Sequence, residues 1–554
     1  MNWGAAARRR GAELWLLLAV GLAAALPIVL AAGYAIVHDW TPLGDDAYIA
    51  TRGFDVFTDR APLVGQRSSG ASGVLDETAY NLGPLLFWVM ALPARLPDGV
   101  FMALLAGAIN IASVVGAVAL ARRRGGLPLM FATAIVIALM LASLPAEAYS
   151  DVWNPSIPLM PLLLLVFLAW SIACGDYRLL PVAVLVASFE AQAHLTFVAP
   201  ALGLMVGALA CAALFRVKGQ GLSRRLAIVT ALVALACWSA PLIDQAVNRP
   251  GNFVLLVRSA SADEPTLGAD AGWRALVHAF GVRPWWLKNS PYPLERLGDL
   301  SVGPTKRAAA SAVLLLAALV VVLFLGWRRR RVDVFAAAAL ALALCAAVAV
   351  AAASTPQNAA ATVSYTLRWA SPAGACVWLL LGWSILTLAP APSRLLRAPR
   401  PRFAVAGGLA ATVLVGAAIA IRENPPRSEP YEPMRAIIDR LDAELPSGGT
   451  TWVESVGTNE TFGMDSGFLV GIVYWLRRTG RNVVTAPAVA DRLSDAYGRG
   501  PYDRVLRLTV NVPPDPDARL VAQVRATDPL MQDAVPKRIV SVTLRPERGV
   551  AAAP

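Results

Sequence analysis

Two adjacent carboxylates, Asp45 and Asp46, stand a few residues beyond the first apolar segment of the chain, which covers residues 14–37. Carboxylates beside a bilayer cost free energy unless they face water or a partner. An ionised aspartate placed there can accept the proton of a sugar hydroxyl and so make the oxygen a stronger nucleophile. The run Gly44-Asp45-Asp46 also fits a solvated turn, which glycine and aspartate favour. The spacing alone leaves both interpretations open.

A second acidic group follows two apolar segments later, where Glu147 and Asp151 lie in a short polar stretch. Asp151 could orient an acceptor molecule, or share a divalent cation such as Mg²⁺ or Mn²⁺ with the first pair, in particular with Asp46. An ordinary polar cap at the start of the next helix explains the same residues. We expect Glu147 and Asp151 to contact substrate, and Asp46 and Asp151 to be the ligands if a cation is bound.

Glu190 and His194 interrupt a later apolar stretch. Ionisable groups inside a membrane span are usually functional or internally paired. The only other histidines are His38 and His278, so no second histidine lies at metal-ligand spacing. We therefore expect His194 to line a substrate cavity rather than to bind a metal.

Two further residues are candidates for substrate binding. Arg368 lies at the approach to the tenth apolar segment, and its planar fork of donors suits a phosphate group. An arginine that extends to the lipid headgroups is the alternative. Trp285 belongs to a stretch rich in proline and tryptophan, where it could stack on a sugar or lie in the aromatic belt of the membrane interface.

Long apolar segments must position these side chains. The chain has 554 residues, 57% of them hydrophobic and 16% charged, whereas soluble domains have about 25% charged residues. The segments predict an α-helical protein with eleven spans, at residues 14–37, 99–121, 127–146, 156–174, 178–194, 196–216, 225–243, 308–327, 333–353, 371–389 and 403–421.

The net charge of +12 could indicate a nucleic-acid partner, but the arginines cluster in short loops between apolar segments, as cytoplasmic loops of membrane proteins do. We therefore expect a lipid bilayer, and no nucleic acid, as partner. The clusters are Arg8–Arg10, Arg122–Arg124, Lys218 with Arg224 and Arg225, Arg328–Arg331, and Arg394 to Arg402. This register predicts a plasma (inner) membrane protein with a cytoplasmic N-terminus and an extracytoplasmic C-terminus.

The predicted organisation has two parts. Residues 1–421 form a transmembrane module with external loops at 38–98 and 244–306. Composition turns polar after Pro425-Pro426, and helix-like and strand-like stretches alternate through residues 422–554, which predicts a small extracytoplasmic α/β domain. We expect the last residues, 549–554, to be disordered.

The stretch Gly44-Asp45-Asp46-Ala47-Tyr48-Ile49-Ala50, directly after the first span, resembles the acidic motif of GT-C-fold glycosyltransferases, the relatives of protein O-mannosyltransferases, aminoarabinose transferases and actinobacterial arabinosyltransferases. Leu82-Gly83-Pro84-Leu85-Leu86-Phe87-Trp88 is similar to a Pro-Pro-Leu-aromatic-Trp stretch in the first external loop of that superfamily. Asn81-Leu82-Gly83 replaces the usual His or Lys and first proline, so no role is taken over for that basic residue.

The resemblance implies a GT-C-like membrane transferase of hexosyl or pentosyl groups, with a polyprenyl-phosphate sugar as donor. Asp45 would be the catalytic base, with Asp46 beside it. Tyr48 and the second-loop Asp151 would lie near substrate, and Arg368 would meet the lipid phosphate. The acceptor would be an extracytoplasmic glycan of the cell wall, a lipid or a protein. The Ala- and Arg-rich composition is typical of bacteria.

Two other functions remain open. A secondary transporter or lipid flippase would place Glu190 and His194 near the membrane midplane, within repeated halves. No internal repeat is visible in the sequence, and no phosphate-binding Gly-x-x-x-x-Gly-Lys-Ser/Thr loop is present, which disfavours ATP-driven transport. A non-catalytic membrane assembly protein would use the C-terminal domain as its binding module and would tolerate replacement of Asp45 and Asp46.

Overall fold

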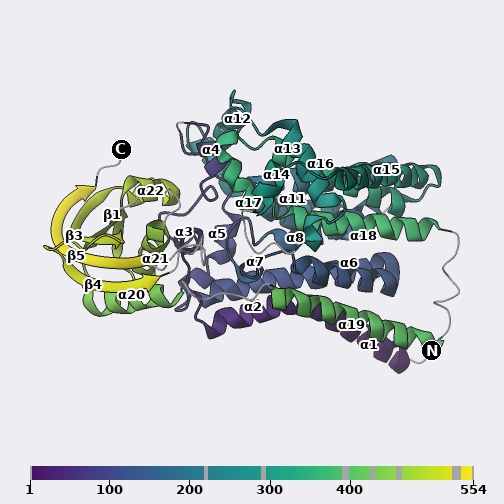
Figure 1. Cartoon of the computed structure of the whole chain (residues 1–554), viewed down its shortest axis with the longest axis horizontal. Helices are drawn as coiled ribbons and strands as arrows, with labels where there is room; N and C mark the ends of the chain where they lie inside the picture. Colours follow the sequence, from purple (N-terminus) through teal and green to yellow (C-terminus); the bar gives the residue numbers. More distant parts are fainter. Residues whose placement is uncertain are drawn as a thin grey trace.

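The computed structural model describes residues 3–75, 77–217, 223–288, 295–389, 399–423, 431–456, 464–526 and 538–551. The molecule is elongated, with a bundle of long helices at one end and a twisted sheet at the other (Figure 1). The short helices of the first external region lie between these two parts. The chain begins at the end of the bundle that lies far from the sheet.

Six helices of the described residues are long and apolar enough to cross a membrane. They are α6 (Val100–Leu141), η3 with α10 (Leu195–Phe197 and Val198–Leu214), α11 (Arg224–Val247), α15 (Lys306–Arg328), α16 (Val332–Ala353) and α18 (Ala370–Leu388). The bent pair α1 (Trp3–Ala24) and α2 (Leu26–Val37), whose axes differ by 64° over the apolar residues, can add a seventh. The predicted multi-pass membrane protein is therefore confirmed, while the number of eleven spans stays a prediction.

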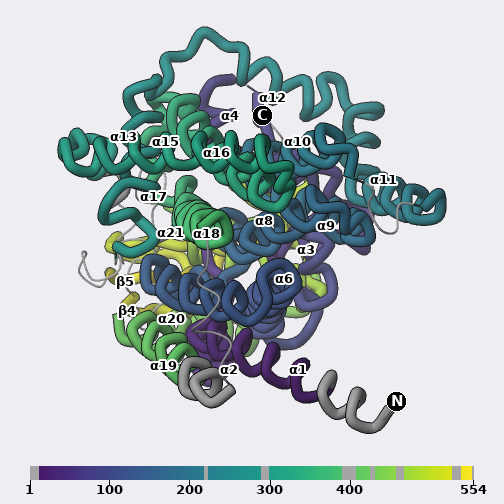
Figure 2. Tube along the Cα trace, turned by 90° about the vertical axis from the view of Figure 1, so that its right-hand side faces the viewer, coloured from purple at the N-terminus to yellow at the C-terminus, as the bar shows by residue number. Residues whose placement is uncertain are grey.

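The other predicted spans correspond to shorter or less apolar helices. These are α8 (Leu159–Ala173), α9 (Leu180–Ala193) and α19 (Pro399–Glu423). Figure 2 looks along the bundle and shows α6, α8 and α18 near its middle, with α11, α13 (Gly268–Phe280) and α19 towards the rim.

The long helix α6 consists of two arms. A straight helix of 42 residues would be about 63 Å long, twice the thickness of a bilayer core. Gly126 breaks it with a φ of +67°, a conformation that glycine adopts without steric cost. Asn110 in the first arm donates a hydrogen bond to the Tyr149 carbonyl, and the Tyr149 hydroxyl donates to the Leu141 carbonyl at the end of the second arm. The chain therefore turns back at Gly126, between the predicted spans 99–121 and 127–146.

The first external region packs as several short helices. They are α3 (Asp45–Asp55), α4 (Ser69–Ser72), α5 (Leu85–Met90) and η1 (Pro93–Arg95). The sequence suggests an interfacial helix in the second half of this region. The structure instead has only the six residues of α5 there, because prolines at 84 and 93 bound the helix. The side chains of Leu85 to Phe87 are buried among the helices rather than exposed at a lipid interface.

The second external region also contains short helices. The structure has α12 (Asn252–Ser261), α13, η4 (Trp285–Leu287) and α14 (Glu295–Ser301). Past α16, η5 (Gln357–Thr362) and α17 (Val363–Thr366) lead to α18. Between α6 and α8 stands the single turn α7 (Glu147–Ser150), and η2 (Tyr177–Leu179) precedes α9.

The C-terminal part is a five-stranded sheet with helices packed on it. Its strands are β1 (Thr450–Val456), β2 (Asn482–Thr485), β3 (Gly500–Val510), β4 (Arg519–Ala526) and β5 (Arg538–Ala551), in the order β2-β1-β3-β5-β4. Strand β1 pairs in parallel with β2 and β3, and β5 pairs antiparallel with β3 and β4. The helices are α20 (Tyr431–Glu444), α21 (Met464–Arg478), α22 (Pro487–Leu493) and η6 (Asp495–Tyr497).

The sequence missed one strand of this sheet. Residues 549–551 were expected in a disordered tail, but they end β5, where Gly549 pairs with Tyr502. The remainder of that tail, residues 552–554, lies outside the described residues. No turn motif follows this stretch in the sequence to mark the end of a strand. Its place in the sheet depends on pairing with β3 and β4 on either side.

The helix α3 joins the two parts of the molecule. Its residues Ala47 and Tyr48, with the preceding Leu43, belong to the same buried apolar cluster as the core of the sheet domain. Ile49 and Ala50, on the other face, belong to a cluster with α5 and α6. A helix with two buried faces holds Asp45 and Asp46, at its first turn, in a fixed place.

Candidate functional site

The first turn of α3 presents the two adjacent carboxylates. Gly44 precedes the helix with a φ of +53°, and its N–H donates to the carbonyl of Gly467 on α21, at 3.1 Å. Carboxylates are stabilised at this position by the positive end of the helix dipole. Successive residues of a helix are rotated by about 100°, so Asp45 and Asp46 point in different directions and meet different partners.

Asp45 meets two hydrogen-bond donors and one positive charge, from three segments of the chain. The indole Nε1 of Trp153 donates a hydrogen bond of 2.8 Å to its Oδ2. Burial raises the pKa of Asp45 above its ordinary value, while the positive charge of Arg492 and the hydrogen bonds from Trp153 and Gln66 act in the opposite direction. A base with a raised pKa takes a proton more readily, and these donors keep part of the population ionised.

Asp46 faces Asp151, so the structure brings the two predicted acidic groups together. Burial is the largest cause that raises the pKa of Asp46, and the adjacent charge of Asp151 adds to it. Burial also raises the pKa of Asp151, although the Trp153 N–H donates to its Oδ1 at 2.9 Å. Two such carboxylates share a proton, or a cation, because like charges cannot both remain uncompensated at close range.

The carboxylates of Asp46 and Asp151 are compatible with a bound divalent cation. The Oδ1 atom of Asp46 is buried and accepts no hydrogen bond in the described part of the chain, which leaves one oxygen available as a ligand. Over the same residues, no group of three or more His, Cys, Asp or Glu side chains is arranged to hold a metal ion. Binding of Mg²⁺ or Mn²⁺ by Asp46 and Asp151 stays a prediction.

Arg368 lies beside the acidic cluster, between α17 and α18. Its guanidinium carbon is 5.3 Å from the centre of the Trp153 ring, which in turn contacts Tyr365 with ring centres 4.9 Å apart. Burial lowers the pKa of Arg368, and the charges of Asp151 and Glu147 oppose that effect. Trp153 thus contacts both Asp45 and Arg368, and it sets the distance between a candidate base and a candidate phosphate ligand.

Tyr48 lies one turn along α3 from Asp45, with only 3% of its surface exposed. Burial raises its pKa to about 12, so the hydroxyl remains protonated and can donate a hydrogen bond. The guanidinium carbon of Arg492, on α22, lies 5.7 Å from the centre of the Tyr48 ring. The predicted residue Tyr48 is therefore part of the same cluster.

The remaining predicted residues lie at different distances from this cluster. His194 contacts the Thr196 hydroxyl at 2.9 Å, and that hydroxyl donates to the Thr366 carbonyl, two residues before Arg368. Trp285 is 2% exposed and belongs to the main apolar core of the helical bundle. Its Nε1 donates a hydrogen bond of 2.8 Å to Asp299, which is not part of the acidic cluster. Substrate contacts by His194 and Trp285 remain predictions.

Sequence reasoning missed Arg492 and Gln66. Both influence Asp45, yet Arg492 stands more than 400 residues later in an ordinary polar helix. Neither residue belongs to a motif. Trp153 lies in the same short polar stretch as Asp151. Residue spacing does not indicate that its indole hydrogen-bonds a carboxylate, so the sequence does not single it out.

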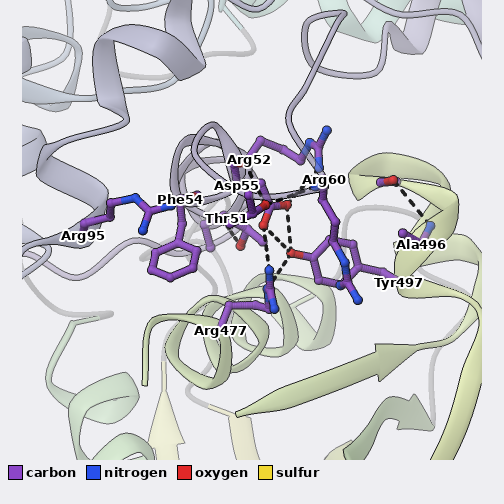
Figure 3. Close-up of polar contacts among 12 residues, drawn as sticks. Thr51, Arg52, Phe54, Asp55, Arg60, Arg95, Arg477, Ala496 and Tyr497 are labelled. Carbon is purple, nitrogen blue, oxygen red and sulfur yellow. Dashed lines mark hydrogen bonds and ion pairs between the residues drawn. The ribbon is translucent and has the colours of Figure 1, made fainter. Parts of the chain in front are cut away.

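A buried network fixes the C-terminal part on α3 (Figure 3). The Asp55 carboxylate, fully buried, accepts hydrogen bonds from Arg52 at 2.8 Å and Arg477 at 3.1 Å. The Tyr497 hydroxyl donates to both Asp55 oxygens, at 3.1 and 2.9 Å, and accepts one from the Arg477 Nε at 3.0 Å. One carboxylate thus ties α21 and η6 to the helix that carries Asp45.

No protein-family model matches the chain, and no curated relative was found. A search of solved structures finds ArnT from Cupriavidus metallidurans in the apo state, with a TM-score of 0.42 and 13% sequence identity over 93% of this chain and 97% of the other.

Proposed function

We propose that this protein is a membrane glycosyltransferase that moves a sugar from a polyprenyl-phosphate donor to a hydroxyl group of an extracytoplasmic acceptor. The observation that carries the proposal is the position of Asp45. It is a partly buried carboxylate that follows the first membrane-spanning pair of helices, hydrogen-bonded to a tryptophan that also contacts Arg368. Asp45 as base and Arg368 as phosphate ligand both contact the indole of Trp153. This arrangement suits a reaction in which a hydroxyl group displaces a phosphate.

The reaction would be a single inverting displacement. Asp45 accepts the proton of the acceptor hydroxyl as its oxygen forms a bond to the anomeric carbon. The bond from that carbon to the phosphate oxygen breaks, and the polyprenyl phosphate leaves with the electron pair. Arg368 stabilises the negative charge that develops on the phosphate, in a site where burial strengthens the interaction.

The pair Asp46 and Asp151 would play a supporting role. With one shared proton it carries a single negative charge and can accept a hydrogen bond from a sugar hydroxyl. A Mg²⁺ or Mn²⁺ ion on the same oxygens would supply positive charge close to the leaving phosphate. Burial raises the pKa of both carboxylates, and the charge of Asp151 raises the pKa of Asp46 further, which supports a shared proton.

The acceptor would be a cell-wall glycan, a lipid or a protein outside a bacterial plasma membrane. The position of Asp45 on α3, between the helical bundle and the C-terminal sheet, supports this, because a soluble acceptor does not enter the bilayer that would surround the bundle. The sheet domain would then form part of the acceptor surface.

One observation favours transport as a second candidate function. Glu190, in α9, is fully buried, and neither of its carboxylate oxygens has a hydrogen-bond partner among the described residues. A carboxylate in that environment is a common feature of proton-coupled transporters. Accumulation of a substrate in vesicles, without a new glycosidic bond, would identify this function.

The decisive test is transfer by purified protein in lipid nanodiscs supplied with a panel of radiolabelled polyprenyl-phosphate sugars and cell-envelope acceptors. We expect one donor to release its label to an acceptor, and Asp45→Asn to reduce the rate by a factor of about 10² to 10⁴, the usual contribution of a general base. The exposed Asp59, near the end of α3, offers a matched control, since Asp59→Asn should leave transfer unchanged. Undiminished transfer by the Asp45 variant would rule out the mechanism.

A further inference from the structure

Two arginines from opposite parts of the molecule meet beside Asp45. Arg67 follows α3 in the first external region, and its backbone pairs with that of Tyr80. The Tyr80 hydroxyl donates a hydrogen bond of 3.0 Å to the carbonyl of Asp491, the residue before Arg492. This contact brings Arg492 from the C-terminal domain next to Arg67, and the charges of the two guanidinium groups interact.

Neither guanidinium has a carboxylate as close partner. Among the described residues, no acidic side chain lies within the 4.0 Å ion-pair distance of Arg67 or Arg492, although the charge of Asp491 reaches Arg67 from farther away. The nearby Arg499, by contrast, pairs with Asp495 at 3.9 Å. Arg67 and Arg492 are both partly buried, so their repulsion is incompletely screened by water. An anion between them would remove this repulsion.

The pair borders the candidate site on the side of the C-terminal domain. Arg492 lies against Tyr48, and its charge acts directly on Asp45. Arg368, the candidate ligand of the leaving phosphate, reaches Asp45 through Trp153 and hydrogen-bonds Ser156 at 3.5 Å, just before α8 of the bundle. Positive charge therefore reaches the surroundings of Asp45 from two parts of the chain: Arg368 from the bundle, and Arg492 from the sheet domain. The charges of Asp45, Arg492 and Arg368 all act on Tyr365.

We propose that Arg67 and Arg492 form an oxyanion subsite, which binds a phosphate or carboxylate group of the acceptor close to the hydroxyl that Asp45 deprotonates. Guanidinium forks bind both groups through paired hydrogen bonds. This inference rests on the proposed function, and it adds that the acceptor is anionic. In an inverting displacement the acceptor and the leaving phosphate lie on opposite sides of the anomeric carbon, so an anionic acceptor needs cations other than the one that meets the leaving phosphate. Arg67 and Arg492 would supply them, while Arg368 meets the phosphate.

The network around Asp55 makes Arg492 a preorganised ligand. Tyr497, five residues after Arg492, donates to Asp55, and Arg477 donates to the same carboxylate (Figure 3). The sheet domain is thus fastened to α3 at one end of the helix, while Arg492 contacts Tyr48 near the other. A ligand that is already held in place loses little conformational entropy on binding.

The test uses the full-length protein in nanodiscs and the arginine reagent phenylglyoxal, with peptide mass mapping of the modified residues. Inorganic phosphate should slow modification of Arg67 and Arg492, by about tenfold at a concentration ten times its dissociation constant. Sodium chloride of equal ionic strength should not. Polyprenyl phosphate without sugar should protect Arg368 and leave Arg492 reactive, because it represents the leaving group.

Matched variants sharpen the assignment. Arg492→Gln should raise the phosphate concentration that protects Arg67 by about tenfold or more, the value of a lost charge-assisted hydrogen bond. Arg499→Gln, seven residues along the chain and exposed, should change nothing. If Arg492→Gln proves misfolded by size-exclusion chromatography, Arg67→Gln with mapping of Arg492 gives the reciprocal measurement.

The outcomes separate the two proposals. Absence of protection by phosphate would overturn the subsite, and protection of Arg492 by polyprenyl phosphate would assign the pair to the donor instead. Once transfer is established, Arg492→Gln should raise KM for the acceptor while KM for the donor stays constant. Retained transfer by Asp45→Asn would refute the proposed mechanism without affecting the phosphate measurements.

Discussion

At the scale of single residues, the chemistry of Asp45 depends on which groups surround it. Burial alone would keep the carboxyl protonated, and it is the donors Trp153 and Gln66 and the charge of Arg492 that favour its ionised form. Its neighbour Asp46 has Asp151 as partner and lacks such donors, so the two aspartates have different protonation states available. Adjacent residues of the same type thus take different roles.

The pH dependence of transfer should reflect this environment. Only the ionised carboxylate can take a proton, so kcat/KM should fall as the pH drops through the pKa of Asp45, and that pKa lies above the ordinary range of an aspartate. Trp153→Phe removes a donor to the charged form, which raises the pKa further and should move this acidic limb up by about one pH unit.

The control for this measurement is Trp452→Phe. The Trp452 indole also donates to a carboxylate, that of Glu454 at 3.0 Å, but on the sheet. Its pH profile should match that of the unmodified protein. A limb that stays in place in Trp153→Phe, or moves to lower pH, would show that Asp45 is not the titrating base.

At the scale of elements, α3 is the connection between the helical bundle and the sheet. Its first turn carries Asp45 and Asp46, and its last residue, Asp55, accepts hydrogen bonds from Arg477 and Tyr497 of the C-terminal domain. An eleven-residue helix therefore links the docking of a domain to the position of the candidate base.

We expect Asp55→Asn to destabilise the protein by about 3–5 kcal/mol, because it leaves the buried Arg477 and Arg52 without their counter-charge. The lower Tm should be accompanied by faster proteolysis of the C-terminal domain and by loss of transfer. Thermal unfolding in detergent and limited trypsin digestion measure both effects. Asp59→Asn, four residues away and exposed, should behave as the unmodified protein, and an unchanged Tm in Asp55→Asn would contradict the proposed role of the network.

At the scale of the whole molecule, basic loops gather at the end of the bundle opposite the sheet. Arg122 pairs with Glu13 at 3.0 Å, and Arg329 hydrogen-bonds the Leu388 carbonyl at 3.2 Å. In Figure 1, α1, α15 and α18 all extend to the end of the bundle that lies far from the sheet. Lys218 and residues 390–398 of the other basic clusters lie outside the described residues. Such a distribution favours a cytoplasmic location for this end.

Labelling of single cysteines would test that orientation. In a background without the five native cysteines, Arg499→Cys in the sheet domain should react with a membrane-impermeant maleimide in intact cells. Arg329→Cys, exposed at the opposite end, should react only after the membrane is opened. The reverse pattern would place the candidate site in the cytoplasm and exclude the proposed donor side.

The sequence by itself determined the membrane class, most helix positions and the presence of a small C-terminal α/β part, and it singled out the acidic residues at positions 45, 46 and 151 as candidates. These follow from local properties: apolar length sets a span, and a carboxylate beside a span is conspicuous because it is costly. The strand β5 and the contacts of Arg492, Gln66 and Asp55 were decided only by the tertiary structure. Each depends on segments that are distant in the chain, and a hydrogen bond or a charge interaction between distant segments leaves no pattern in residue spacing.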